Sequence, residues 1–198
     1  MKIVFMKYLI VGIIFSTFFY SCKFEKHEKE ISGINLLRIQ LSSTDSLLKN
    51  VDVALVERIV IELQNNSKLI QFNINKIGDT LDFKTASFLN SYRLLLPFFM
   101  KVANDHNKIA VAIDSTKLNL TNLEHDILNN SLAQNLTPDA CLLLEQEQVK
   151  AMYDCAVTLR STLDEVSNTL DSLSPQIALY IKEQNQKLER KAIELEKK

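Results

Sequence analysis

Hydrophobic residues recur along the chain at alternating intervals of three and four, the spacing of one face of a packed α-helix. The clearest run extends from Leu142 to Leu173, where nine of ten such positions are apolar and Glu145 is the exception. Just before this run, Thr137 can act as the N-cap and Pro138 stands at the first helical position. We therefore predict a long helix that begins at Pro138.

A second run keeps the same interval from Phe88 to Ile127 and passes Pro97 without losing register. This continuity predicts one long helix, near residues 81–135, that is kinked at the proline. The alternative is two helices separated at residues 104–107, which are locally turn-like.

A third run predicts a helix near residues 34–77, with a shift of one residue between Leu55 and Ile59. Gly78 then ends the helix, because glycine readily adopts the left-handed conformation that closes a helix.

Two short connections join the three predicted helices. Asp79 or Thr80 is expected to cap the second helix, and residues 135–138 form the other turn. Since short connections place consecutive helices side by side, the sequence predicts an all-α fold, an elongated antiparallel bundle of three long helices. A break at Pro175, with Ser174 as the cap, would instead give a fourth helix and a shorter bundle.

Residues 182–198 carry charges at most positions and only a thin apolar stripe. We predict a solvated helix that frays at its end; the alternative is a docking strip for a partner helix. The stripe consists of Ile181, Leu188, Ala192 and Leu195.

Residues 1–21 have the order of an export signal. Lys2 and Lys7 precede an apolar stretch over residues 8–20, and small Ser21 precedes Cys22. The stretch holds 13 residues, whereas a helix that crosses a bilayer needs roughly 20. We therefore expect cleavage between Ser21 and Cys22 rather than a permanent membrane span.

The segment Phe19-Tyr20-Ser21-Cys22 resembles the lipobox of bacterial lipoproteins. Ser21 and Cys22 fit the family pattern, whereas Phe19 and Tyr20 are bulkier than the residues usual there. The resemblance implies that the Cys22 thiol is diacylated and that Cys22 becomes the mature N-terminus. More than one acyl chain would hold the protein stably on a membrane. The alternative is an ordinary signal peptide followed by an incidental cysteine.

The resemblance also bears on location and domain organisation. Lys23 stands where many diderm bacteria use Asp to retain a lipoprotein at the inner membrane, so an outer-membrane lipoprotein is implied, in the periplasm or at the cell surface. A Gram-positive membrane is the alternative. Residues 22–33 are expected to form a charged tether after Cys22, and residues 34–198 a single helical bundle domain.

Charge and composition exclude several function classes. Without the two lysines of the signal, 21 basic and 24 acidic side chains remain, and no clustered basic surface favours nucleic acid. With three glycines in the chain, phosphate-binding loops and nucleophile elbows could hardly form. We expect no enzyme activity, no catalytic residue and no cofactor.

The histidines and cysteines do not group into a site. His106 and His125 are separated by 19 residues, about 28 Å along a helix, and neither has a Glu three residues before it, so no metal site is expected. His106 is predicted to lie in the core with a local hydrogen bond, and His125 on a solvated face. Cys141 and Cys155 lie about 21 Å apart on one helix, too far for a disulfide. Both are expected to be small buried residues, with intermolecular pairing as the alternative.

These features predict a lipid-anchored cell-envelope protein whose helical body is a non-enzymatic spacer or protein-binding module. Its partners would be the membrane, through the lipid on Cys22, and another protein. Two alternatives are an inhibitor or immunity-type lipoprotein and a carrier of a small apolar ligand, the latter favoured by a cavity near Phe98 and Phe99. We call each such run of positions at intervals of three and four a helix seam. Polar residues on the seams are expected either to line a channel or to fix helix register. They are Asn66, Asn73, Thr116 and Glu145.

Overall fold

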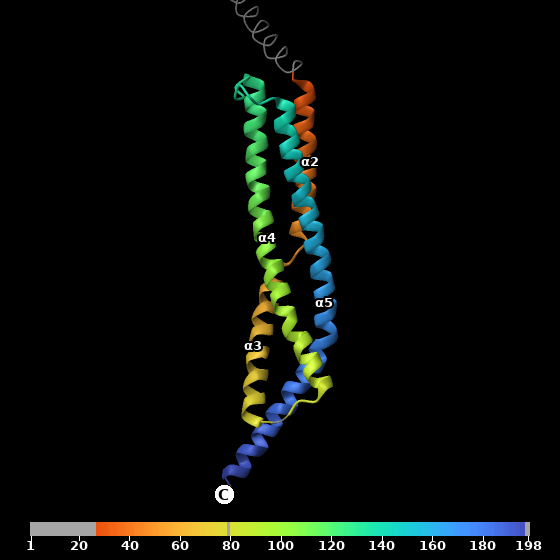
Figure 1. The fold of residues 1–198 in the computed structure, drawn as a ribbon, viewed down its shortest axis with the longest axis vertical. Coiled ribbons are helices and arrows are strands. Elements are labelled where there is room, and N and C mark those ends of the chain that lie inside the picture. Colours follow the sequence, from red (N-terminus) through yellow and green to blue (C-terminus); the bar gives the residue numbers. More distant parts are fainter. Residues whose placement is uncertain (1–26, 79, 197–198) are drawn as a thin grey trace, which may run out of the picture. The chain divides into compact units, whose positions relative to one another are not determined.

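The computed structural model describes residues 27–78 and 80–196. Within these ranges the fold is all-α, as predicted, with four helices and no strand (Figure 1). The helices are α2 (Glu28–Lys49), α3 (Val53–Ile77), α4 (Phe83–Asn129) and α5 (Pro138–Glu196). The described chain divides into two compact units, and both α4 and α5 contribute a segment to each unit.

The first unit contains α2 up to residue 46, residues 111–129 of α4 and residues 138–154 of α5. Its core is a single apolar seam from the three segments, and the predicted positions on α4 and α5 supply most of it. The buried residues include Ile31, Ile34, Leu37, Leu41, Ile113, Leu120, Ile127, Val149 and Met152.

Two ion pairs show that α2 and α4 run antiparallel in this unit. Arg38 Nη2 lies 2.6 Å from Glu124 Oε2, and Lys117 Nζ lies 3.3 Å from Asp45 Oδ2. Moving seven residues forward along α2 therefore moves the partner seven residues back along α4. The pKa of Lys117 is raised, first by its hydrogen bond to Asp114 and then by the contact with Asp45.

By contrast, α2 and α5 run parallel in this unit. Lys29 Nζ lies 3.3 Å from Asp139 Oδ1, and a Cβ added at Gly33 would meet Leu142 Cδ1 at 3.3 Å. The partner residue thus advances along α5 as α2 advances. A larger residue than glycine at position 33 would press on the Leu142 side chain.

The second unit contains residues 47–110 and, of the described chain, residues 155–196. Asn66 Nδ2 donates to Tyr92 Oη at 2.9 Å, between α3 and α4, and the Phe88 and Tyr180 rings meet edge to face at 6.0 Å, between α4 and α5. The core of this unit comprises Leu48, Val51, Val56, Leu63, Ile70, Leu89, Tyr92, Leu95, Phe99, Val102, Ile109, Ala156, Leu159, Val166, Ile177 and Tyr180.

The predicted first helix, residues 34–77, is divided into two helices at residues 50–52. Asp52 caps α3 by accepting a hydrogen bond from Leu55 N at 2.9 Å, and the chain resets its register at this break. As a result Val56 is buried, and Leu55, predicted on the seam, is 46 % exposed. The register shift therefore lies earlier than predicted.

Helix α2 also begins six residues before the predicted start, at Glu28. The apolar seam continues toward the N-terminus through Ile31, which is 3 % exposed. Residues 28–33, predicted to belong to a charged tether, are thus the first turns of a packed helix.

Helix α4 is continuous through Pro97 and residues 104–107, which confirms the prediction of one long helix over the alternative of two. It ends at Asn129 rather than near residue 135, because Asn130 takes a left-handed conformation with φ of 52°. Ser131 N then donates to Asp126 O at 2.9 Å and closes the last turn.

Capping interactions fix the two hairpin turns. Gly78 ends α3 in the left-handed conformation, as predicted. Asp82 caps α4 in place of the predicted Asp79 or Thr80: Thr85 N and Thr85 Oγ1 both donate to its carboxylate, which lowers the pKa of Asp82. The predicted cap of α5 is confirmed, since Ala140 N donates to Thr137 Oγ1 at 3.2 Å.

Helix α5 continues past Pro175, so no fourth helix begins there. Ser174 does not act as a cap; its Oγ donates to Leu170 O at 2.8 Å, one turn earlier in the same helix.

The C-terminal part of α5 packs against α3, where the sequence predicted a solvated helix. Asn73 Nδ2 donates to Asn185 Oδ1 at 3.0 Å, and Lys191 Nζ donates to the carbonyl oxygens of Lys76 and Ile77 at 3.2 and 3.3 Å. A cation there offsets the partial negative charge of the last turn of α3. Most of the stretch is nevertheless exposed, as predicted: among residues 182–195 only Gln184 is buried and only Leu188 is half-buried.

Candidate functional site

The predicted lipidation site, Cys22, and the predicted cleavage point after Ser21 lie outside the described residues. Helix α2 begins at Glu28, six residues after Cys22 in the sequence. Of the helices described, none combines the length and hydropathy that crossing a membrane requires.

The three histidines have different surroundings. His125 is exposed, 3.6 Å from Asp126, as predicted for a solvated face. His106 is half-buried, but its Nδ1 has no hydrogen-bond partner among the described residues, so the predicted local hydrogen bond is not formed. His27 Nε2 is also buried without a partner in that part of the chain.

Both described cysteines are free. Burial was predicted for both, and the prediction is wrong for each of them. Cys141 is half-buried and Cys155 is exposed. Each directly precedes a seam position, Leu142 or Ala156, so its side chain points about 100° away from the centre of the seam. Across residues 27–78 and 80–196, no group of three or more potential metal ligands is found.

Two polar residues on the predicted seams pair with other helices in the second unit. Burial raises the pKa of Tyr92, whose hydroxyl accepts the hydrogen bond from Asn66. Asn73 is 1 % exposed and donates to Asn185, while its own Oδ1 is left without a partner in the described chain. The Asn73–Asn185 pair fits a role in helix register. Asn66 and Tyr92 instead border a cavity of about 280 Å³, whose lining also includes Glu62 and Ser174.

Glu145 interrupts the seam of α5 in the first unit. Its Oε2 is buried and meets no hydrogen-bond donor among the described residues. Burial raises the pKa of the Glu145 carboxyl, because the charged form loses contact with water.

Shallow cavities lie at helix interfaces in both units. In the first unit a notch of about 260 Å³ separates α2 from α5. It is lined by Gln40, Ser43, Gln146, Val149, Lys150 and Tyr153. In the second unit a groove of about 220 Å³ lies between α3 and α4. Its lining is half aliphatic, from Ile70, Ile74, Leu81, Ala86 and Leu89, and half polar or aromatic, from Ser67, Gln71, Asn90, Tyr92 and Arg93.

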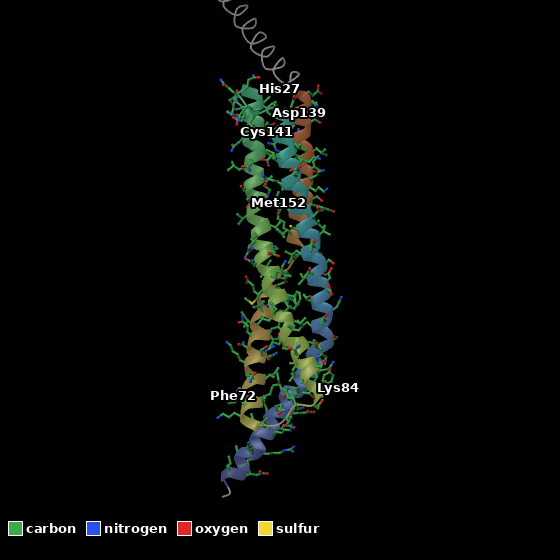
Figure 2. All side chains as sticks on the ribbon, in the orientation of Figure 1. His27, Phe72, Lys84, Asp139, Cys141 and Met152 are labelled. Atoms are coloured by element: carbon green, nitrogen blue, oxygen red, sulfur yellow. The ribbon has the colours of Figure 1, made fainter. Side chains whose placement is uncertain are left out.

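The aromatic pair proposed from the sequence to border a ligand cavity is arranged differently. Phe99 is completely buried in the core of the second unit, and Phe98 is 47 % exposed on its surface. Another phenylalanine, Phe72, projects outward from α3 at the periphery of this unit (Figure 2).

The outer face of α2 is a feature that the sequence reading missed. Leu36 and Ile39 are 57 % and 67 % exposed on this face, opposite the seam. Between Ile31 and Thr44 the sole charged residue is Arg38, which is paired with α4. This low charge over 14 residues, in a chain that is 24 % charged, was the available signal.

No protein-family model, curated protein or solved structure matches this chain.

Proposed function

We propose that this chain is a lipid-anchored protein of the bacterial cell envelope, and that its helical body is a non-enzymatic spacer or protein-binding module. The observation that carries the proposal is the position of Cys22, directly after an export-type apolar stretch and a small residue. A thiol there can accept the lipid, and helix α2 starts only six residues later. A short connection of this kind would keep the first unit close to the membrane surface.

A binding role is supported by the surface of α2. Leu36 and Ile39 are large apolar side chains that remain exposed on a helix face with few charges. Interface cores are depleted in charged residues, which is the composition of this face. The contact between buried Asn73 and Asn185 fits a rigid scaffold, because a polar contact between helices fixes their register.

The test is chemical crosslinking in a diderm host that expresses the full chain with a C-terminal tag, followed by affinity purification and mass spectrometry. Wild type is compared with Cys22→Ser and with Cys141→Ser, a matched loss of a thiol elsewhere. We expect membrane association and a specific crosslinked protein for wild type and for Cys141→Ser, and the loss of both for Cys22→Ser. Wild-type protein that stays in the soluble fraction would refute the anchor.

Lys23 provides a separate test of location. The residue after the lipidated cysteine directs the proposed outer-membrane sorting, so Lys23→Asp should move the protein from the outer to the inner membrane fraction. Lys26→Asp is the matched control, with the same charge change three residues further on. An unchanged distribution for Lys23→Asp would contradict the outer-membrane assignment.

A second candidate function, a carrier of a small apolar ligand, is favoured by the groove between α3 and α4. Its lining combines five aliphatic side chains with polar ones, Arg93 among them. An environment-sensitive fluorescent fatty acid would report binding by the purified protein, and Ile74→Glu should abolish the signal. Equal fluorescence for wild type and Ile74→Glu would eliminate this candidate.

A further inference from the structure

Five exposed residues form a second periodic stripe on α2, on the side opposite the core seam. This α2 stripe consists of Ser32, Leu36, Ile39, Ser43 and Ser46. Its members are spaced by four, three, four and three residues, the interval at which one helix packs along another. The two large side chains lie in the middle of the stripe, and small serines occupy the remaining positions, where they leave room for close approach of a second backbone.

The α2 stripe offers almost no charge to a partner. Between Ile31 and Thr44 its exposed neighbours on α2 are the neutral Asn35, Gln40 and Ser42. Charges lie beyond its two ends, at Glu28, Lys29 and Lys49, and Lys150 of α5 lines the notch beside Ser43. The nearby Arg38 is occupied, since its Nη2 lies 2.6 Å from Glu124 Oε2 on α4. A lipid headgroup, a nucleic acid or a strongly charged protein would gain little electrostatic attraction on this face. An equally uncharged helix face is the complementary surface.

This chain supplies such a face itself. We propose that the α2 stripes of two copies pack against each other, parallel and in register, while both copies are anchored in the same membrane. The parallel direction rests on the proposed lipid on Cys22, which precedes α2 by six residues and would place the stripes of neighbouring copies at the same height. Leu36 then meets Leu36 and Ile39 meets Ile39, and between Ser32 and Ser46 no like charges of the stripe are brought together.

The pairing depends on the membrane. Each copy contributes only two large apolar side chains, which is little against the entropy lost when two free molecules associate. Anchoring in one bilayer removes much of that loss, because it confines the copies and raises their effective concentration. Dimers should therefore be abundant for the anchored protein and scarce for dilute soluble protein.

Disulfide crosslinking of the full chain in cells tests the pairing. Cys141→Ser and Cys155→Ser remove the described thiols, and one new cysteine is then placed at Leu36, Ile39 or Ser43. Leu118→Cys, on the exposed surface of α4, is the matched control. After mild oxidation we expect several-fold more disulfide-linked dimer at the three stripe positions than at Leu118.

A charge on the stripe provides the second variant. Ile39→Lys should strongly reduce the dimer formed through Ser43→Cys, because two lysines would face each other, and exposure of Ile39 means that the fold tolerates the change. Equal crosslinking at the stripe and at Leu118, or crosslinking that Ile39→Lys leaves unchanged, would overturn the pairing.

Membrane fractionation of the same cells separates this inference from the proposed function. Membrane-bound protein without stripe-specific dimers would overturn the pairing and leave the anchor standing. Stripe-specific dimers in the soluble fraction would uphold the contact but refute both the anchor and the membrane dependence. Soluble protein without such dimers would refute both the pairing and the anchor.

Discussion

Replacing Glu145 by methionine should stabilise the protein at neutral pH. The side chain lies on the packed seam of α5, and its Oε2 is buried without a hydrogen-bond partner among the described residues. This oxygen therefore loses contact with water and gains no donor in return. Methionine has a similar length and flexibility, and it would fill the same space without a charge.

The expected gain in the free energy of unfolding follows from the partial burial of Glu145. An orphaned buried polar group costs about 1–3 kcal/mol, and residual contact of this side chain with water places the cost near the lower end, about 1 kcal/mol. For a chain of this size, 1 kcal/mol corresponds to a rise in Tm of about 2–4 °C.

The pH dependence gives the prediction a second, independent readout. Burial raises the folded-state pKa of Glu145 above its ordinary value of 4.5. Below pH 4.5 the carboxyl is protonated in the folded and the unfolded chain, so the charge costs no stability. As the pH rises through the folded-state pKa the cost appears, and above it the cost is complete. The advantage of Glu145→Met should therefore shrink on acidification.

Thermal unfolding followed by circular dichroism at pH 7.5 and pH 4 measures both effects. Glu145→Gln removes only the charge and should retain part of the gain at pH 7.5. Glu147→Met is the control, since Glu147 is exposed on the same helix, and it should leave Tm unchanged. A Glu145→Met variant that is no more stable than wild type at pH 7.5, or whose advantage is the same at both pH values, would refute the reasoning.

Three further predictions concern stability, each measured by the urea midpoint of unfolding. Phe99→Ala should cost about 3–5 kcal/mol, because Phe99 is completely buried and the change leaves a cavity; a loss below about 1 kcal/mol would show a loosely packed core. Gly78→Ala should cost about 1 kcal/mol, since Gly78 has φ of 72° and a side chain is strained there, and an unchanged midpoint would argue against this helix end. Asp52→Ala removes the cap on Leu55 N and should cost about 1 kcal/mol, whereas Asp52→Asn, which keeps an acceptor, should cost much less.

The core of α4 could be predicted from the sequence almost completely. Every apolar position of the predicted seam from Tyr92 to Ile127 is buried. The reason is physical: a helix that packs along its length buries one stripe, and the interval between apolar residues marks that stripe wherever the helix is unbroken. Pro97 did not interrupt the interval, and it does not interrupt the helix.

The boundaries were harder to predict, because they depend on contacts that the interval does not record. The break at residues 50–52 contains neither glycine nor proline, and it is identified only by the hydrogen bond that Asp52 accepts. The start at Glu28 was hidden by the charges before Ile31, which resemble a tether although Ile31 is buried. Packing of Asn185 and Lys191 on α3 could not be foreseen, since their partners lie more than 100 residues away.

The candidate site was predicted unevenly. Exposure of Cys155 follows from its place one residue off the seam, and the type of residue alone suggested burial. The α2 stripe was overlooked because two apolar and three small polar residues give only a weak hydrophobic pattern. The low charge between Ile31 and Thr44 is the stronger signal, and this low charge becomes informative once Arg38 is seen to be paired with Glu124.

Metabolic labelling with radioactive palmitate in a diderm host tests the lipid anchor most directly. Wild type, Cys22→Ser and the matched Cys141→Ser variant are purified through a C-terminal tag, and the label in each is measured beside the amount found in the membrane fraction. The lipid-anchor account predicts label and membrane association for wild type and Cys141→Ser, with neither for Cys22→Ser. Wild-type protein without label, or equal labelling of Cys22→Ser, would contradict it.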